Sequence, residues 1–114
     1  MHEYSLVQSL LARVEAEARS RQAMAVHRVV VRIGELAGVD PDLFATAYDC
    51  FRAGTACERA ALELERVPTR WSCPRCLREI PRGEVLACGV CQSPAEVGPG
   101  SDEIMLVRLE MEVR

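Results

Sequence analysis

The sequence of 114 residues lacks lysine, has few aromatic residues and contains no long apolar run. All fourteen basic residues are arginine, which we interpret as a compositional bias of the source rather than as a binding site. Aromatic residues make up only 4% of the chain, so the core must be mainly aliphatic, and the hydrophobic fraction of 49% suffices for one compact domain. No apolar stretch approaches the roughly 18 residues of a membrane span, so we predict no membrane partner.

The acidic balance and the N-terminal residues restrict the class of protein further. The net charge is −3 and the isoelectric point about 5.4, whereas domains that bind nucleic acid usually carry a basic footprint, so we predict no nucleic-acid partner. The chain opens with His2 and Glu3 instead of a basic region followed by an apolar run, so we expect no signal peptide and a cytoplasmic protein. Cysteines stay reduced in that compartment, which favours metal binding over disulfides.

Four of the six cysteines form two Cys-x-x-Cys pairs, Cys73 with Cys76 and Cys88 with Cys91, with eleven residues between the pairs. Each turn points two thiolates at one centre, and two turns complete the tetrahedron of sulfurs that structural zinc favours. The segment offers neither a ligand with an open position nor a general base. We therefore predict a closed Zn²⁺ site with a structural role, in which Gly89 eases the second turn.

Other uses of this spacing stay open on the residues alone. A rubredoxin-type iron site would carry electrons. A redox dithiol needs only one such pair and lacks a thioredoxin-like context here. The segment is locally basic, with Arg70, Arg75, Arg78 and Arg82, which should offset the thiolate charge and would also suit a zinc ribbon that contacts nucleic acid or protein. The acidic chain, with Trp71 as the single stacking candidate, counts against nucleic acid.

Two segments have the spacing of helices. Residues 5–21 predict a helix that opens with a capping box of Ser5 and Gln8. Asp40 and Pro41 are typical of an N-cap and a first helical position, which predicts a second helix that ends near residue 54. The expected buried residues are Leu6, Val7, Leu10, Leu11, Val14 and Ala18 in the first helix and Phe44, Ala47, Tyr48 and Phe51 in the second.

Runs of β-branched or alternating apolar residues predict strands over 27–34, 61–67 and 104–113. We therefore expect an α+β fold in which two helices pack on a small three-stranded sheet. In the last strand, one face is predicted to carry Met105, Val107, Leu109, Met111 and Val113, and the other face Arg108, Glu110 and Glu112.

The cysteine segment lies between the last two predicted strands, with turn residues at both of its edges. We expect it to form a zinc-ribbon-like Cys₄ module inserted between those strands. If the two strands pair antiparallel, the module is the tip of a hairpin. The chain is accordingly divided into an α+β domain, residues 1–68 plus 101–114, and a zinc-binding module, residues 69–100.

The N-terminus is a second candidate metal site. A free terminal amine has a pKa near 8, so the amine of Met1, nearby backbone nitrogens and the imidazole of His2 form a nitrogen-rich set that suits Ni²⁺ or Cu²⁺. An exposed, flexible terminus without a ligand role is the alternative. Elsewhere, His27 is expected at the surface rather than as a ligand, and Cys50 and Cys57 as buried free thiols.

Several segments carry a resemblance that covers nearly the whole chain in order. They are MHEYSL, VRIGELAGVDPDLFATAYDCF, GTACERAALELE, the paired cysteines and SDEIMLVRLEMEV. Together they resemble the HypA/HybF family, nickel metallochaperones for [NiFe]-hydrogenase maturation. Tyr4 and the short gap between the cysteine pairs depart from the family pattern without touching a ligand. Asp40 stands where an extra nickel contact has been considered in this family, but its N-cap role explains it equally well, so we leave it out of the site.

The resemblance implies that His2 is the main nickel ligand, helped by the amine of Met1 and by backbone nitrogens around His2 and Glu3. It implies that Zn²⁺ is held structurally by Cys73, Cys76, Cys88 and Cys91. It further implies a HypB-type GTPase and a hydrogenase large subunit as partners, with Ni²⁺ as the transported ion and residues 1–68 plus 101–114 as the nickel-binding domain.

No nucleophile, acid–base pair or phosphate loop argues for an enzyme. We therefore predict a non-enzymatic nickel metallochaperone that binds Ni²⁺ at its N-terminus and delivers it for hydrogenase maturation. The alternative is a zinc-ribbon adaptor protein without a nickel role.

Overall fold

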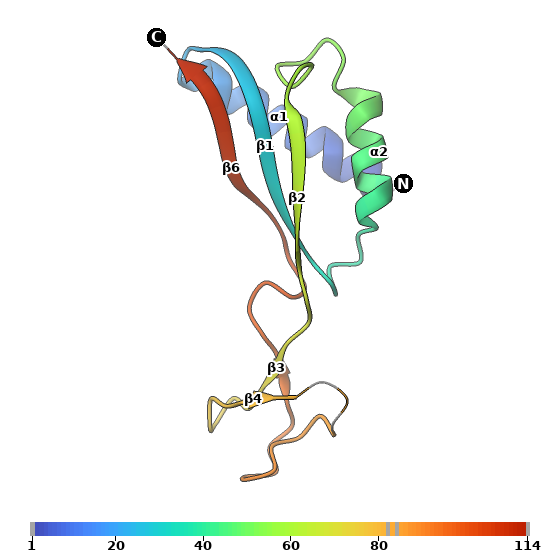
Figure 1. Ribbon diagram of the computed structural model, residues 1–114, viewed down its shortest axis with the longest axis vertical. Coiled ribbons are helices and arrows are strands. Elements are labelled where there is room, and N and C mark those ends of the chain that lie inside the picture. Colours follow the sequence, from blue (N-terminus) through green and yellow to red (C-terminus); the bar gives the residue numbers. More distant parts are fainter. Residues whose placement is uncertain (1, 82, 84, 114) are drawn as a thin grey trace.

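The computed structural model describes residues 2–81, 83 and 85–113 of the chain. The elements in order are α1 (His2–Ser20), β1 (Ala23–Gly34), α2 (Pro41–Phe51), β2 (Ala61–Val67), β3 (Trp71–Ser72), β4 (Glu79–Ile80), β5 (Glu96–Val97) and β6 (Ile104–Val113). The strands form two three-stranded sheets, in the orders β2-β1-β6 and β4-β3-β5. The larger sheet and both helices form a body, and the smaller sheet belongs to the cysteine module (Figure 1). The predicted α+β fold with an inserted four-cysteine module is confirmed.

The molecule is elongated. Its principal extents are 55 × 30 × 16 Å and its radius of gyration is 17.9 Å, against about 13 Å for a compact domain of this length. The cause is visible in Figure 1, where the module continues the long axis of the molecule beyond the end of the larger sheet. Neither helix in the described part of the chain is long and apolar enough to cross a membrane.

β1 is the central strand of the larger sheet. It pairs parallel with β2 and antiparallel with β6, so β2 and β6 lie on opposite sides of β1 and do not pair with each other. The expectation of a hairpin with the module at its tip is therefore wrong. The physical reason is that β1 has buried residues on both faces, including Val29, Val30 and Val31, which suits a central strand. The parallel pair requires a crossover connection, which α2 provides.

The two helices supply one side of an aliphatic core. The core residues of the helices are Val7, Leu10, Leu11, Val14 and Ala18 in α1 and Phe44, Ala47 and Tyr48 in α2. They confirm the predicted apolar stripes except at Leu6, which is only partly buried, and at Phe51, which is 36% exposed. The ring of Phe51 instead meets the edge of Tyr4, with 5.5 Å between ring centroids, and so joins the end of α2 to the start of α1.

The two helix starts differ in how well the sequence predicted them. Asp40 is the N-cap of α2 as predicted, because its Oδ1 accepts hydrogen bonds from the N–H groups of Asp42 at 2.9 Å and Leu43 at 3.2 Å. The capping box of Ser5 and Gln8 is wrong, since α1 begins at His2 and Ser5 lies inside it. An acidic residue in the first turn, Glu3, favours this earlier start through the helix dipole.

β6 contains an irregularity that changes its faces. Val31 lies opposite Leu106 but Val30 lies opposite Arg108, so Val107 is an extra residue in the strand. A one-residue shift exchanges the two faces of a strand. The core side of β6 is therefore formed by Ile104, Leu106, Leu109 and Met111, whereas Met105, Val107 and Val113 are exposed, which corrects the predicted face.

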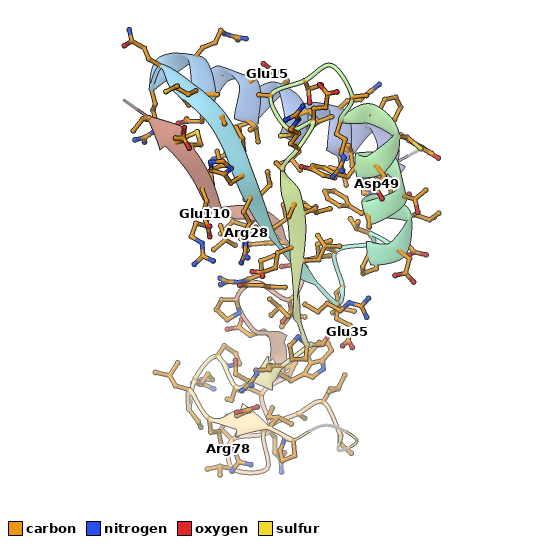
Figure 2. All side chains as sticks on the ribbon, turned by 45° about the horizontal axis from the view of Figure 1, so that its top comes forward. Glu15, Arg28, Glu35, Asp49, Arg78 and Glu110 are labelled. Atoms are coloured by element: carbon orange, nitrogen blue, oxygen red, sulfur yellow. The ribbon has the colours of Figure 1, made fainter. Side chains whose placement is uncertain are left out.

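The sheet face opposite the helices is covered by charged side chains. Arg28 lies between two strands, with its guanidinium 3.1 Å from Glu63 and 3.9 Å from Glu110 (Figure 2). Arg32 and Glu65 pair at 3.0 Å on the same face. These exposed pairs each contribute little to stability.

Candidate metal centres

The two Cys-x-x-Cys turns have the same construction, fifteen residues apart. In the first, the N–H of Leu77 donates to the carbonyl of Cys73 at 2.9 Å; in the second, the N–H of Gln92 donates to the carbonyl of Cys88 at 2.8 Å. Each turn is closed by a further bond from the N–H of its first cysteine, at 2.9 Å in both cases. Equal backbone paths place the two pairs of thiols in equivalent positions.

The four sulfurs converge on one point. The Sγ atoms of Cys73, Cys76, Cys88 and Cys91 all lie within 4.8 Å of one another, and those of Cys73 and Cys91 are 3.4 Å apart. A tetrahedral zinc site with Zn–S bonds of about 2.3 Å has sulfur–sulfur distances of about 3.8 Å, so small shifts would complete it. Cys73 and Cys88 are buried and Cys76 is exposed, so the site lies at the surface of the module. The donor set fits Zn²⁺.

Hydrogen bonds shift the pKa values of three of the four thiols in different directions. Ser93, whose hydroxyl oxygen is 3.2 Å from the Cys91 sulfur, lowers the pKa of Cys91 to about 6. Backbone N–H groups of Cys91 and Val90 lower the pKa of Cys88. Hydrogen bonds to the neighbouring cysteines raise the pKa of Cys76 to about 12. A cation is therefore needed to keep all four sulfurs ionised at neutral pH, which couples metal binding to proton release.

The residues around the cysteines differ from those expected. Leu77 and Gln92, each following the second cysteine of a pair, have φ of 59° and 61°, whereas Gly89 has no positive φ. The left-handed residues of these turns are thus not glycines, although such positions favour glycine. Leu77 is also 84% exposed.

The arginines lie in several environments. Arg70 forms an ion pair with the carboxylate of Glu79, with 3.6 Å between Nη1 and Oε1. Arg78 lies beside the second cysteine turn, with Nη2 3.9 Å from the position of a Cβ at Gly89. Arg82 lies outside the described residues. The thiols instead have the Ser93 hydroxyl and backbone N–H groups as hydrogen-bond partners, such as the N–H of Cys76 at 3.3 Å from the Cys73 sulfur.

The loop after β1 fastens the module to the body. The N–H of Thr69 donates to the Glu35 carboxylate at 3.1 Å, and the N–H of Leu36 donates to the carbonyl of Ser101 at 2.7 Å. Figure 2 shows Glu35 at this junction. Gly34 packs so closely that a Cβ there would lie 2.2 Å from the carbonyl oxygen of Gly100. One loop thus holds both segments that lead into the module.

The N-terminal candidate ligands lie on the body. His2 is the first residue of α1 and is exposed, whereas Met1 lies outside the described residues. Glu3 is only 9% exposed, and its Oε2 accepts a hydrogen bond from the N–H of Asp40 at 3.1 Å. That bond is the main cause of the lowered pKa of Glu3. The first N–H groups of a helix have no backbone partner within the helix. The N–H of Glu3 contributes to the lowered pKa of its own carboxylate.

Two further predictions concerned isolated residues. His27 is exposed, with Nε2 3.4 Å from Glu112, as expected of a surface residue. Cys57 is buried as predicted, but Cys50 is exposed, because α2 turns its last residues toward solvent. Sequence reasoning missed the bond between Glu3 and Asp40 and the role of Ser93. The only signal for the first was an acidic residue beside the N-terminus, and for the second a serine two residues after a cysteine.

Comparison with known proteins gives matches over the whole length of the chain. The sequence model of the HypA family, described as hydrogenase/urease nickel incorporation, metallochaperone, matches residues 1–111. The hydrogenase maturation factor HypA of Wolinella succinogenes is 39% identical over 114 residues, covering 98% of this chain and 96% of that protein. The corresponding factor of Aquifex aeolicus is also 39% identical over 114 residues, with 99% of each chain covered.

Two solved structures have the same fold. The solution structure of the Ni metallochaperone HypA from Helicobacter pylori superimposes with a TM-score of 0.71 and 31% identity, covering 98% of both chains. A second solution structure, of a HypA protein, gives a TM-score of 0.80 and 33% identity over all of this chain and 98% of that chain.

Proposed function

This chain belongs to the HypA family of metallochaperones for nickel incorporation into hydrogenase and urease, and from that premise we propose that it binds Ni²⁺ at its N-terminus and delivers it for maturation of [NiFe]-hydrogenase. A metallochaperone transports an ion and is not an enzyme. The observation that carries the proposal is the position of His2, exposed at the first residue of α1 on the body. An exposed site with few ligands exchanges its ion readily, as a carrier requires.

The proposed nickel ligands are nitrogen atoms at the start of the chain. They are the imidazole of His2, the backbone nitrogens of His2 and Glu3, and the terminal amine of Met1, which lies outside the described residues. Nitrogen-rich tetragonal sets suit Ni²⁺. The carboxylate of Glu3 accepts the hydrogen bond from Asp40, so we assign that side chain to holding the first turn of α1 in place.

Structural zinc is proposed for Cys73, Cys76, Cys88 and Cys91. The convergence of four sulfurs from two equivalent turns supports this assignment, and a closed set of four thiolates leaves no position for a substrate. The ion would tie the two turns together and so stabilise residues 69–100 as a module separate from the body, residues 1–68 plus 101–114.

The remaining parts of the proposal concern where and with what the protein acts. We propose a HypB-type GTPase and the hydrogenase large subunit as partners, in the cytoplasm. The sequence contains no phosphate loop, so any GTPase activity in the process must come from a partner. The module exposes Leu77 and Val85, at 84% and 81%, which supports a contact role for this end of the molecule and also favours the alternative of a zinc-ribbon adaptor.

Calorimetric titration of the untagged, zinc-loaded protein with Ni²⁺ tests the nickel site. His2→Ala should abolish the high-affinity step, and an N-terminal extension should do the same because it removes the free amine. His27→Ala is the matched control, since His27 is the second exposed histidine of the chain and should leave the titration unchanged. Nickel affinity should fall as the pH is lowered, because the amine and the imidazole must both lose a proton.

Equal nickel affinity in the wild type and in His2→Ala would disprove the site. The adaptor alternative makes the opposite pair of predictions. It requires that His2→Ala keep full activity in hydrogenase maturation, and that substitution of Arg75 and Arg78 in the module abolish it. Metal analysis of the purified protein, with zinc counted per chain, tests the zinc assignment independently.

A further inference from the structure

β2 is an outer strand of the larger sheet. In the described part of the chain it pairs with β1 alone and ends the strand order on its side of the sheet (Figure 1). The pairing runs in continuous register from Ala61 to Val67, and neither a proline nor a lysine occurs in these seven residues. Native edge strands are usually protected by such residues or by bulges, because a regular edge presents N–H and C=O groups to which a further strand can pair. The edge of β2 lacks this protection.

A groove follows this edge on the helix side of the sheet. It has a volume of about 330 Å³ and lies between α2 and β2, so α2 does not close the space beside the strand. Leu62 and Leu64 line the groove from β2 and are only partly buried by the core. Ala45 lines it from α2. The groove can therefore receive apolar side chains from a strand placed beside β2.

One wall of the groove is held in place by a fixed arginine. The Nη1 of Arg52 donates to the carbonyl of Ala60 at 3.1 Å and lies 3.7 Å from the carboxylate of Asp49. The guanidinium group also lies over the ring of Tyr48, 5.6 Å from its centre. A side chain with these contacts need not be reordered when a ligand enters, which lowers the entropic cost of binding.

The opposite face of β2 is acidic. Glu63 and Glu65 alternate with the two leucines and pair with Arg28 at 3.1 Å and Arg32 at 3.0 Å, both on β1. The two glutamate side chains nevertheless remain 44% and 42% exposed, and Arg28 is shared with Glu110. Because an ionised carboxylate has about four sites that accept hydrogen bonds, each glutamate can take a second cation from beyond the edge.

We propose that the edge of β2 binds an extended segment of a partner protein in which apolar and basic residues alternate. Successive side chains of a strand point to opposite faces, so every second residue of the segment would enter the groove beside Leu62 and Leu64. The residues between them would lie next to Glu63 and Glu65, where opposite charges stabilise a strand pair. Main-chain hydrogen bonds would supply the affinity and the alternating side chains the specificity.

A second copy of β2 does not fit this edge. Two-fold antiparallel pairing about Leu64 would place Glu63 of each copy opposite Glu65 of the other. Like charges directly opposite each other destabilise a strand pair. Charge complementarity therefore selects a different, basic segment as the occupant.

Heteronuclear NMR of the zinc-loaded, full-length protein tests the proposal by titration with a blocked peptide of alternating arginine and valine. We expect amide shifts along residues 61–67 and in the part of α2 that lines the groove, with an affinity that falls as salt is raised. A peptide of alternating glutamate and valine should bind at least about tenfold more weakly, because it places carboxylates beside Glu63 and Glu65.

Backbone methylation of the peptide tests whether the contact is a strand pair. Alternate N–H groups of a strand point to opposite sides, so two peptides can be made, each methylated on one of the two alternating sets of backbone nitrogens. The peptide methylated on the set that faces β2 should lose binding, and the other should keep it. Equal binding of the two would overturn strand addition.

A pair of tryptophan variants tests the groove. Ala45→Trp fills the groove from α2 and should weaken binding of the arginine–valine peptide by about tenfold or more. Thr46→Trp is the matched control, because Thr46 is exposed on the same helix and does not line the groove. It should leave the affinity unchanged. Equal affinity of the two folded variants would contradict the proposal.

A pair of double variants tests the charges and decides the question even if Ala45→Trp fails to fold. Glu63→Gln with Glu65→Gln should weaken peptide binding by about tenfold and reduce its salt dependence. Glu110→Gln with Glu112→Gln removes two carboxylates from β6 instead and should leave the affinity nearly unchanged. Far-ultraviolet circular dichroism checks that each variant is folded.

Three further results would overturn the proposal: no binding of the arginine–valine peptide, equal binding of the glutamate–valine peptide, or amide shifts confined to β6. Shifts along β2 that depend on protein concentration without peptide would show a second copy at this edge and would overturn it as well. The titrations contain no nickel, so their outcome is independent of the proposed function.

Discussion

The carboxylate of Glu3 accepts a hydrogen bond from the backbone N–H of Asp40, with 3.1 Å between Oε2 and N. The bond joins the first turn of α1 to the N-cap of α2, although the two residues are 37 positions apart. Glu3 is therefore turned into the body while its neighbour His2 is exposed. A fixed first turn defines where the proposed nickel ligands lie.

This bond predicts a specific sensitivity to acid. The N–H of Asp40 lowers the pKa of Glu3 in the folded protein below its unfolded value, about 4.3. The ionised carboxylate therefore stabilises the fold above that pH, and the contribution is lost as the pH falls through the folded pKa. Glu3→Gln should lower the Tm at pH 6 and show a weaker further decline toward pH 3. Thermal unfolding at several pH values measures both effects.

The control for this experiment is Glu58→Gln, because Glu58 is exposed and its side chain has no hydrogen-bond or ion-pair partner among the described residues. It should follow the wild type at every pH. An acid decline in Glu3→Gln as steep as that of the wild type would show that the bond does not form.

Burial of Tyr48 and Cys57 predicts a loss of stability at high pH. Desolvation raises the pKa of both groups in the folded state, and the Tyr48 hydroxyl donates to the carbonyl of Ala60 at 2.8 Å. A group whose pKa is raised in the folded state stabilises the fold below its unfolded pKa, which is about 10 for Tyr48 and about 8.5 for Cys57. That contribution is lost as the pH rises above these values. Urea unfolding between pH 7 and pH 10.5 should therefore show a declining free energy of unfolding.

Tyr48→Phe separates the two groups. It should cost about 1 kcal/mol at pH 7 through the lost hydrogen bond, while Ala60 keeps a donor in Arg52 at 3.1 Å. Above pH 9 its stability should decline less than that of the wild type. A decline identical to the wild type would assign the alkaline limb to Cys57, which Cys57→Ala would then remove.

Gly34→Ala should disturb the junction between body and module. The new Cβ would lie 2.2 Å from the carbonyl oxygen of Gly100 and 2.3 Å from that of Ser101, and both are backbone atoms that cannot rotate away. We expect a loss of about 1–3 kcal/mol or more. Small-angle scattering should also show a changed radius of gyration, because the segment that leads into the module is displaced.

Gly89→Ala is the matched substitution for this test. Its Cβ would meet only the far end of the Arg78 side chain, at 3.9 Å, and its φ is not positive. It should change the stability by less than Gly34→Ala does. Equal effects would mean that the junction is not held at Gly34.

Ser93→Ala should raise the pKa of Cys91 in the metal-free protein. Ser93 is the main cause of the lowered value of about 6, through both its hydroxyl and its backbone N–H, and only the hydroxyl is removed by the substitution. At pH 7 the thiolate fraction of Cys91, and with it the rate of alkylation, should fall. Mass spectrometry of each cysteine after timed alkylation measures this, with the distant Cys50 as internal reference. An unchanged rate at Cys91 would contradict the assignment.

The parts of this fold that the sequence predicted are those that depend on local spacing. The apolar stripes of α1 and α2, the cap at Asp40 and the two cysteine turns each arise from residues within a few positions of one another. The strand order was not predictable in this way, because it depends on which of three apolar segments can be buried on both faces. The extra residue at Val107 in β6 could not be predicted either, since an alternating sequence pattern does not reveal a shift in the pairing register with β1.

The same distinction between local spacing and tertiary contact decides which residues of the candidate site were predictable. The cysteines were predictable because their chemistry demands a fixed spacing. The contact of Glu3 with Asp40 was not, since it forms only when two helices meet. Cys50 was expected inside because cysteine is usually buried, but its position on α2 places it in solvent.

The position of β1 between β2 and β6 has a consequence for protein engineering. Gly34 lies opposite Val67 and Ile33 lies opposite Ile104, so β2 ends and β6 begins at the same end of β1. Two interstrand spacings, about 10 Å, separate these chain ends, a distance that a linker of a few residues can span. The module can therefore be excised or exchanged between relatives without cutting the larger sheet, on which α1 with the proposed nickel ligand His2 packs, and this makes chimaeric metallochaperones a practical design.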